Sequence, residues 1–107
     1  MSCQIVFTDT AKSDLREIAL NIAERAQDKH IAIRFVKELQ EATKTLETFP
    51  ESGAIPKDRV LVSNGYRFIS HKDYLMFYQY SKAENTVYMM AIFHGKLDYM
   101  CVMKKFI

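Results

Sequence analysis

The residues best suited to acid–base chemistry lie near the end of the chain, where His94-Gly95-Lys96 is followed closely by Asp98 and Tyr99. The imidazole ring is the side chain that most readily exchanges a proton near neutral pH. With Lys96 as a cation and Tyr99 as a stacking ring, His94 has the partners needed to cleave RNA by removing a 2′-hydroxyl proton. The alternative is a histidine that only caps the end of a strand through one satisfied hydrogen bond.

Two arginines extend this candidate set. Arg67 alternates with apolar neighbours on an expected strand, so its guanidinium can lie on a sheet face and bind a phosphate through two hydrogen bonds. A structural salt bridge to Asp73 or Asp98 is the alternative for Arg67. Arg59 is expected in a solvated loop. The candidate catalytic residues are therefore His94, Arg67, Lys96 and Tyr99, and the candidate RNA-binding residues are Arg59, Arg67 and Lys96.

Charge is unevenly distributed along the 107 residues of the chain. Residues 1–56 hold seven Lys and Arg against nine Asp and Glu, a net charge of −2, whereas residues 57–107 hold eight against four, a net charge of +4. The positive field of the second half favours a polyanion or an acidic partner. The opposing interpretation is an ordinary solvated surface.

Several classes of protein are disfavoured by motifs that the sequence lacks. It contains no P-loop, GxGxxG, GxSxG or HExxH motif. Its two cysteines, Cys3 and Cys101, are too few for a structural zinc site, so we expect no metal and no cofactor. The longest apolar run is five residues, Met89 to Phe93, so we expect no membrane contact and a cytoplasmic location.

The elements that must position the candidate residues follow from hydrophobic periodicity. Residues 4–7 are typical of a short strand, and apolar positions spaced by three and four predict one helix from residue 11 to about 28 and a second from 32 to 46. Because the link between the helices is short, they should form an antiparallel hairpin that Phe49-Pro50 ends. A loop containing both prolines follows at residues 50–58.

The second half of the chain predicts strands. These are expected at residues 60–62, 66–69, 74–80 and 86–94, with Asn64-Gly65 as the first turn. The expected fold is a single α+β domain over residues 1–107, in the order β-α-α-β-β-β. In it, a short N-terminal strand joins a mainly antiparallel sheet, the helical hairpin packs on one sheet face, and a short C-terminal extension follows.

The second face of the expected sheet is a candidate interaction surface. Strict alternation along the last two strands would place tyrosines, methionines and basic groups there, whereas two helices can cover only the other face. An exposed surface of this kind usually marks a binding site. The apolar end of the chain, Phe106-Ile107, should dock either on its own domain or on a partner.

A series of short motifs carries a family resemblance through its order and spacing. The motifs are Phe7-Thr8, Ala11, Asp14-Leu15, Ile18, Ala32, Phe35, Leu39, Leu46-Glu47-Thr48-Phe49-Pro50, Gly53, Gly65-Tyr66-Arg67-Phe68, Asp73-Tyr74-Leu75-Met76-Phe77-Tyr78, Ile92-Phe93-His94-Gly95-Lys96 and Asp98-Tyr99. Over nearly its whole length the chain resembles the RelE/ParE superfamily of bacterial toxins from type II toxin–antitoxin modules. The resemblance implies the same β-α-α-β-β-β fold.

The resemblance also implies a partner. Toxins of this superfamily inhibit growth and are held inactive by a cognate antitoxin, which typically folds as it wraps the toxin into a hetero-oligomer. We expect the antitoxin to contact the second sheet face and the C-terminal tail. The residues concerned are Tyr78, Tyr80, Tyr88, Met90, Met103 and Phe106.

The superfamily divides according to target, and three interpretations follow. ParE-like members inhibit DNA gyrase, and the long hairpin and the His-Gly-basic-x-Asp ending resemble that branch. RelE-like members cleave mRNA on the ribosome without a metal; this sequence lacks their dense basic cluster, although Arg67, His94, Lys96 and Tyr99 would still make a nuclease site. We therefore expect gyrase ahead of mRNA. A non-toxic adaptor on the same fold is the third interpretation.

Overall fold

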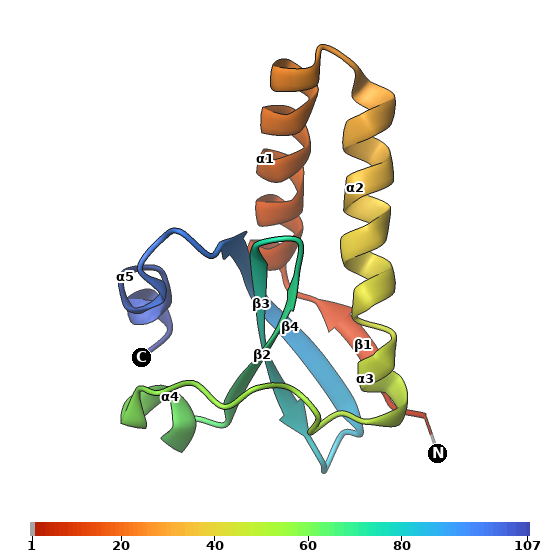
Figure 1. Cartoon of the computed structure of the whole chain (residues 1–107). Coiled ribbons are helices and arrows are strands. Elements are labelled where there is room, and N and C mark those ends of the chain that lie inside the picture. The colour runs from red at the N-terminus through yellow and green to blue at the C-terminus, as the bar shows by residue number, and fades with distance from the viewer. Residues whose placement is uncertain (1) are drawn as a thin grey trace.

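A four-stranded mixed sheet with two long helices on one side forms the centre of the molecule (Figure 1). The structure is a computed structural model that describes residues 2–107. Its strands are β1 (Gln4–Phe7), β2 (Tyr66–His71), β3 (Tyr74–Ser81) and β4 (Thr86–His94). Its helices are α1 (Asp9–Ala26), α2 (Lys29–Ala42), α3 (Thr45–Thr48), α4 (Arg59–Ser63) and α5 (Tyr99–Met103), followed by the 3-10 helix η1 (Lys104–Phe106).

The strands lie in the order β1-β4-β3-β2. β1 runs parallel to β4, with Gln4 opposite Thr86, and the other two pairs are antiparallel. The expected α+β fold, with its helical hairpin on one face of a mainly antiparallel sheet, is confirmed. No helix among residues 2–107 is both long enough and apolar enough to cross a membrane.

The helical hairpin is defined by caps that the sequence encodes locally. α1 begins where the Thr8 hydroxyl accepts a hydrogen bond from the Ala11 backbone N–H, at 3.2 Å. It ends at Gln27, whose φ of 51° lies in the left-handed region. The Asp28 carboxylate then starts α2 by accepting from the His30 backbone N–H. The two helices stand side by side and extend beyond the sheet (Figure 1).

One expected strand is wrong: residues 60–62 lie in the short helix α4. The Asp58 carboxylate caps that helix by accepting from the backbone N–H groups of Val60 and Leu61. This cap, together with the full burial of Leu61 in the core, outweighs the β-propensity of the valines. Asn64-Gly65 consequently ends a helix and does not join two strands.

A β-bulge changes which side chains share a sheet face. Tyr78 lies opposite Met89 and Phe77 lies opposite Ala91, so Met90 is the extra residue in β4. Beyond Met90 the strict alternation expected from the sequence fails. Ile92 packs on the hairpin side of the sheet, whereas Ala91 and Phe93 pack on the other.

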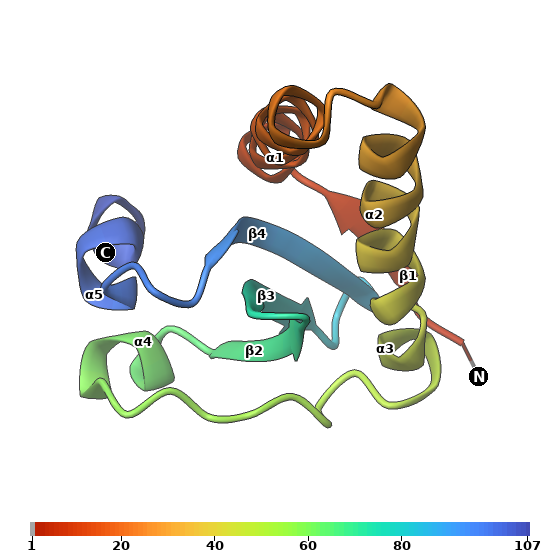
Figure 2. The ribbon, with the colours of Figure 1, turned by 45° about the horizontal axis from the view of Figure 1, so that its top comes forward.

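The second sheet face is covered, contrary to the expectation that it lies open. Leu61 from α4 and Met103 from α5 are fully buried there against Phe77 and Ala91. Figures 1 and 2 show α4 and α5 close together, away from the hairpin. The sheet therefore has a hydrophobic core on each face, and the C-terminal tail docks on its own domain.

Candidate functional site

His94 is held at the end of β4 by its own backbone neighbour. Its Nδ1 accepts a hydrogen bond from the Lys96 backbone N–H at 3.0 Å. Its ring packs edge-on against Tyr74, with the centroids 5.1 Å apart. The capping arrangement weighed for His94 is therefore present, and Nε2 is the ring nitrogen left for another partner.

Arg67 does not share a site with His94. Arg67 pairs across the sheet with Tyr78, and His94 pairs with Tyr74. These two rows lie four residues apart along β3, a distance of about 13 Å at roughly 3.3 Å per residue. Arg67 and His94 are therefore anchored at well-separated points of the sheet.

The Arg67 guanidinium has a structural partner instead. Its Nη1 donates to the Gly53 carbonyl oxygen at 3.2 Å, and the Gly53 N–H donates to the Tyr78 hydroxyl at 2.9 Å. Among residues 2–107, no salt bridge joins Arg67 to Asp73 or Asp98. Arg67 and Tyr78 together tie the loop before α4 to the sheet.

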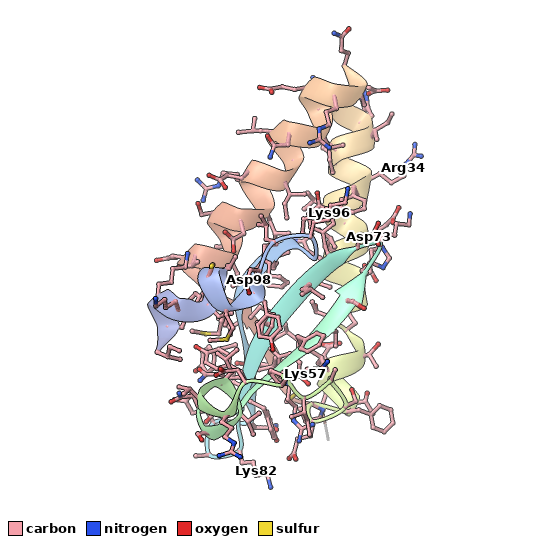
Figure 3. All side chains as sticks on the ribbon, turned by 60° about the vertical axis from the view of Figure 1, so that its left-hand side comes forward. Arg34, Lys57, Asp73, Lys82, Lys96 and Asp98 are labelled. Atoms are coloured by element: carbon pink, nitrogen blue, oxygen red, sulfur yellow. The ribbon has the colours of Figure 1, made fainter. Side chains whose placement is uncertain are left out.

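The remaining candidate RNA-cleaving residues lie on different surfaces. Tyr99 packs on the second core, with its ring 5.7 Å from that of Phe77. Lys96 is exposed beside Asp73 at one end of the sheet, whereas Lys57, two residues before Arg59, lies toward the other end (Figure 3). The structure thus brings His94 and Lys96 together through the backbone but leaves Arg59, Arg67 and Tyr99 apart from them.

A cleft does open beside His94, between α1, the end of β4 and the C-terminal segment. It has a volume of about 360 Å³, and α1 contributes Asp14, Glu17 and Arg25 to its wall. The positive charge of Lys105 also acts on Asp14 and partly offsets the rise in its pKa, so the carboxylates of this wall have cationic neighbours.

Asp14 in this cleft entered the sequence analysis only as part of a family motif and was given no role in a site. Its Oδ2 accepts a hydrogen bond from the Ile92 backbone N–H at 2.9 Å, next to the bulge in β4. Burial raises the pKa of Asp14 above its ordinary value, and the hydrogen bond from Ile92 offsets part of that increase. A lone aspartate beside Leu15 gives no sequence signal of such a contact, which joins residues 78 positions apart.

A second unforeseen cluster joins α2 to the turn between β2 and β3. Glu38 accepts from Lys72 Nζ at 2.8 Å and lies 3.1 Å from His71 Nε2. The hydrogen bonds from Lys72 and His71 lower the pKa of Glu38. His71 lies half-buried here, with its ring near that of Phe35.

The six side chains expected to meet an antitoxin do not form one exposed face. Tyr78 and Met103 are 0% exposed, because the first is buried under the hairpin and the second under α5. Tyr80 also packs on the hairpin side. Tyr88, Met90 and Phe106 are half-exposed. The hairpin covers the face of β3 that carries Tyr78 and Tyr80, and α5 buries Met103, so the six side chains are divided between the two faces.

Within the described part of the chain, no three His, Cys, Asp or Glu side chains gather closely enough to hold a metal ion. The two cysteines lie in different surroundings. Cys3 is buried, Cys101 is exposed, and neither forms a disulfide.

One family model matches most of the chain. A family model described as the ParE toxin of the type II toxin–antitoxin system parDE matches residues 5–99. Among curated proteins, no sequence is significantly similar to the chain.

Solved structures with the same fold come from both branches of the superfamily. A chain of the chromosomal ParDE system from P. aeruginosa superimposes with a TM-score of 0.69 at 17% identity, covering 87% of this chain and 96% of that one. A chain of the RelBE2 complex from Mycobacterium tuberculosis gives 0.64 at 17% identity, covering 88% and 92%. The isolated E. coli RelE toxin gives 0.52 at 14% identity, covering 99% and 100%. At these identities the likeness establishes the fold.

Proposed function

Because the chain belongs to the ParE toxin family of type II toxin–antitoxin systems, we propose that it inhibits growth by binding DNA gyrase and not by cleaving mRNA. A cognate antitoxin is the partner that keeps such a toxin inactive. The observation that carries the choice of target is the separation of Arg67 from His94, about 13 Å along the sheet.

The surroundings of each candidate group support the same choice. An RNA-cleaving centre needs an acid–base group and a cation converging on one phosphate. His94 instead faces a wall carrying Asp14 and Glu17, while the Arg67 guanidinium bonds the Gly53 carbonyl oxygen. Binding a protein target requires no such convergence.

The test is induced expression of the wild type and of the double variant His94→Ala/Lys96→Ala, with Lys57→Ala as a matched control toward the other end of the sheet. We expect all three to stop growth, to leave mRNA intact and to alter plasmid supercoiling. The purified chains should also inhibit gyrase supercoiling in vitro to within about twofold of one another, since the substituted groups are exposed or half-exposed.

Other outcomes would support the alternatives. Cleaved mRNA in the wild type, together with a folded double variant that no longer stops growth, would establish a nuclease and refute the gyrase proposal. No growth defect with any chain would favour a non-toxic adaptor. Circular dichroism of each purified variant separates lost function from lost folding.

For the antitoxin we propose contacts at the half-exposed members of the expected set on the second face, Tyr88, Met90 and Phe106. Tyr88 donates its hydroxyl proton to Glu84 in the turn between β3 and β4. Substituting each by alanine should weaken antitoxin capture in a pull-down. Unchanged capture by all three would place the antitoxin elsewhere.

A further inference from the structure

The cleft beside His94 follows one face of α1 over most of the length of that helix. Asp14, Ile18, Asn21 and Arg25 line it, and their spacing of three and four residues places them in one row along the helix. The opposite wall comes from the end of β4 and from the C-terminal segment. The cleft is therefore enclosed by separate elements and is longer than it is wide.

The two ends of this cleft carry opposite charge. Asp14 and Glu17 lie at the end next to the sheet, where Asp14 bonds the Ile92 backbone N–H, whereas Arg25 lies in the last turn of α1. From Glu17 to Arg25 the helix rises by about 12 Å, at roughly 1.5 Å per residue. This separation is too long for a direct ion pair. Among residues 2–107, no salt bridge includes Asp14, Glu17 or Arg25.

The floor between the charged ends is apolar. Ile18 of α1 and Ile92 of β4 are buried there, and Ile22 is half-buried. The volume of about 360 Å³ lies within the range of small-molecule sites, which is about 300–1,000 Å³. Such sites typically combine an apolar lining with a few polar groups that fix the orientation of the ligand.

We propose that this cleft binds a small linear molecule with an ammonium group at one end, a carboxylate at the other and an aliphatic chain between them. The ammonium group lies beside Asp14 and Glu17. The carboxylate binds the guanidinium of Arg25, whose two parallel N–H groups match its geometry. The aliphatic chain covers Ile18 and Ile22, which removes their exposed surface from water.

The acidic end of the cleft has incomplete charge compensation. Burial raises the pKa of Asp14, the Ile92 N–H offsets part of this rise, and so does the charge of Lys105. The charge of Glu17 raises it further. Lys105 forms no salt bridge with Asp14. An ammonium group between the two carboxylates favours their ionised forms and competes with Lys105 for them.

The opposite charges at the two ends exclude simpler ligands. A nucleic acid presents only anions along its backbone, so it would leave the Asp14–Glu17 end unpaired. A molecule that carries only an ammonium group would leave Arg25 unpaired. A ligand with both groups satisfies both ends at once. The inference goes beyond gyrase inhibition, because it depends only on the cleft in this chain.

The test measures binding of three probes to the purified chain by calorimetry and by NMR. The probes are ω-aminooctanoate, octylamine and octanoate, which share the aliphatic chain and differ in their charged ends. We expect ω-aminooctanoate to bind at least about tenfold more tightly than either of the others, since each charged end adds a charge-assisted contact. The amide signals of Asn21 and His94 should shift as it binds.

Single substitutions assign each end of the ligand. Arg25→Gln should abolish the preference for ω-aminooctanoate over octylamine, and Glu17→Gln should weaken its preference over octanoate. Lys105→Gln removes a competing cation and should strengthen binding. Arg16→Gln and Glu24→Gln are matched controls, because they change the same charges on α1 but lie outside the cleft. All five residues are exposed, so the variants should fold, and circular dichroism checks this.

Four results would overturn the proposal. Equal affinity for the three probes would show unselective apolar binding. Equal weakening by Arg25→Gln and Arg16→Gln would show that only net charge matters. Absence of binding by all three probes would exclude this class of ligand. A peptide with lysine and glutamate on either side of two leucines, if it binds more than about tenfold more tightly than ω-aminooctanoate and shifts the same amides, would identify a protein segment as the occupant.

Discussion

Gly53 is the residue on which two otherwise separate contacts meet. Its N–H donates to the Tyr78 hydroxyl and its carbonyl oxygen accepts from Arg67. A Cβ at this position would lie 2.5 Å from the Tyr78 hydroxyl oxygen, so only glycine fits. Arg67, which the sequence suggested as a phosphate-binding residue, instead helps to hold the loop before α4 against the sheet.

Tyr78→Phe should lower the free energy of unfolding by about 1–3 kcal/mol, because it leaves the buried Gly53 N–H without an acceptor. The matched control is Tyr80→Phe. Its hydroxyl donates to exposed Asn85 at 3.3 Å, so the change should stay within about 0.5 kcal/mol. Urea denaturation of both variants measures the two values. Equal changes would mean that the Gly53 contact contributes nothing specific.

Asp14 makes stability depend on pH in the direction opposite to most carboxylates. Burial raises its pKa above the ordinary 3.8, so between these two values the folded chain binds more protons than the unfolded chain. Its contribution to stability is therefore fully present below pH 3.8 and is lost as the pH rises through the raised value. Asp14→Asn removes this loss and keeps an acceptor for the Ile92 N–H.

We therefore expect Asp14→Asn to gain stability relative to the wild type as the pH rises from about 3.8 toward neutrality, as measured by urea denaturation at several pH values. Asp14→Ala also removes the ionisation, but it leaves the Ile92 N–H unpaired. It should be less stable than Asp14→Asn by about 1 kcal/mol at every pH. A difference between Asp14→Asn and the wild type that does not change with pH would contradict the assignment.

At the scale of elements, the sequence predicts the two long helices, because their hydrophobic periodicity and their capping residues are local features of the chain. The stripe through Ala11, Leu15 and Ile18 and the caps at Thr8 and Asp28 set the hairpin correctly. Valines at 60 and 62 favoured a strand, but the Asp58 cap folds them into α4. Where two local signals compete, the burial of Leu61 in the assembled core decides between them.

The contacts of the candidate site were predictable only between residues that are close together in the sequence. The hydrogen bond between His94 and Lys96 spans two positions and follows from their adjacency. The location of Arg67 depends on the register between β2 and β3, the burial of Tyr78 depends on which sheet face the hairpin covers, and the faces of Ala91 and Ile92 depend on the bulge at Met90. Register and bulges arise from packing over the whole sheet, so alternation in one strand cannot reveal them.

The C-terminal segment contributes to stability because it covers the second core. Met103 is fully buried there, whereas Cys101, two positions earlier on the same short helix, is exposed. Met103→Ala should lower the free energy of unfolding by about 2–5 kcal/mol. Cys101→Ala should change it by less than about 0.5 kcal/mol. Similar values for the two variants, measured in urea, would mean that α5 is not docked in solution.

At the scale of the whole molecule, the hairpin makes the chain elongated. The principal extents are 42 × 32 × 21 Å, and the radius of gyration of 13.8 Å exceeds the value of about 13 Å typical of this length. The sheet supports the base of the hairpin, while its tip near Gln27 extends beyond the sheet (Figure 1). The base contains the buried residues Leu15 and Leu39, whereas Ile22 near the tip is only partly buried.

This gradient in burial should appear as a gradient in local stability. Amide hydrogens near Leu15 and Leu39 are released only by global unfolding, whereas those near the tip need only local opening of the last helical turns. Hydrogen exchange followed by NMR should therefore show protection that falls along α1 from Leu15 to Ala26. Correspondingly, Ile22→Ala should raise exchange at the tip more than at the base, and Leu39→Ala should raise it throughout. Uniform protection along α1 would mean that the hairpin opens as one unit with the sheet, leaving no independently mobile tip for a partner to engage.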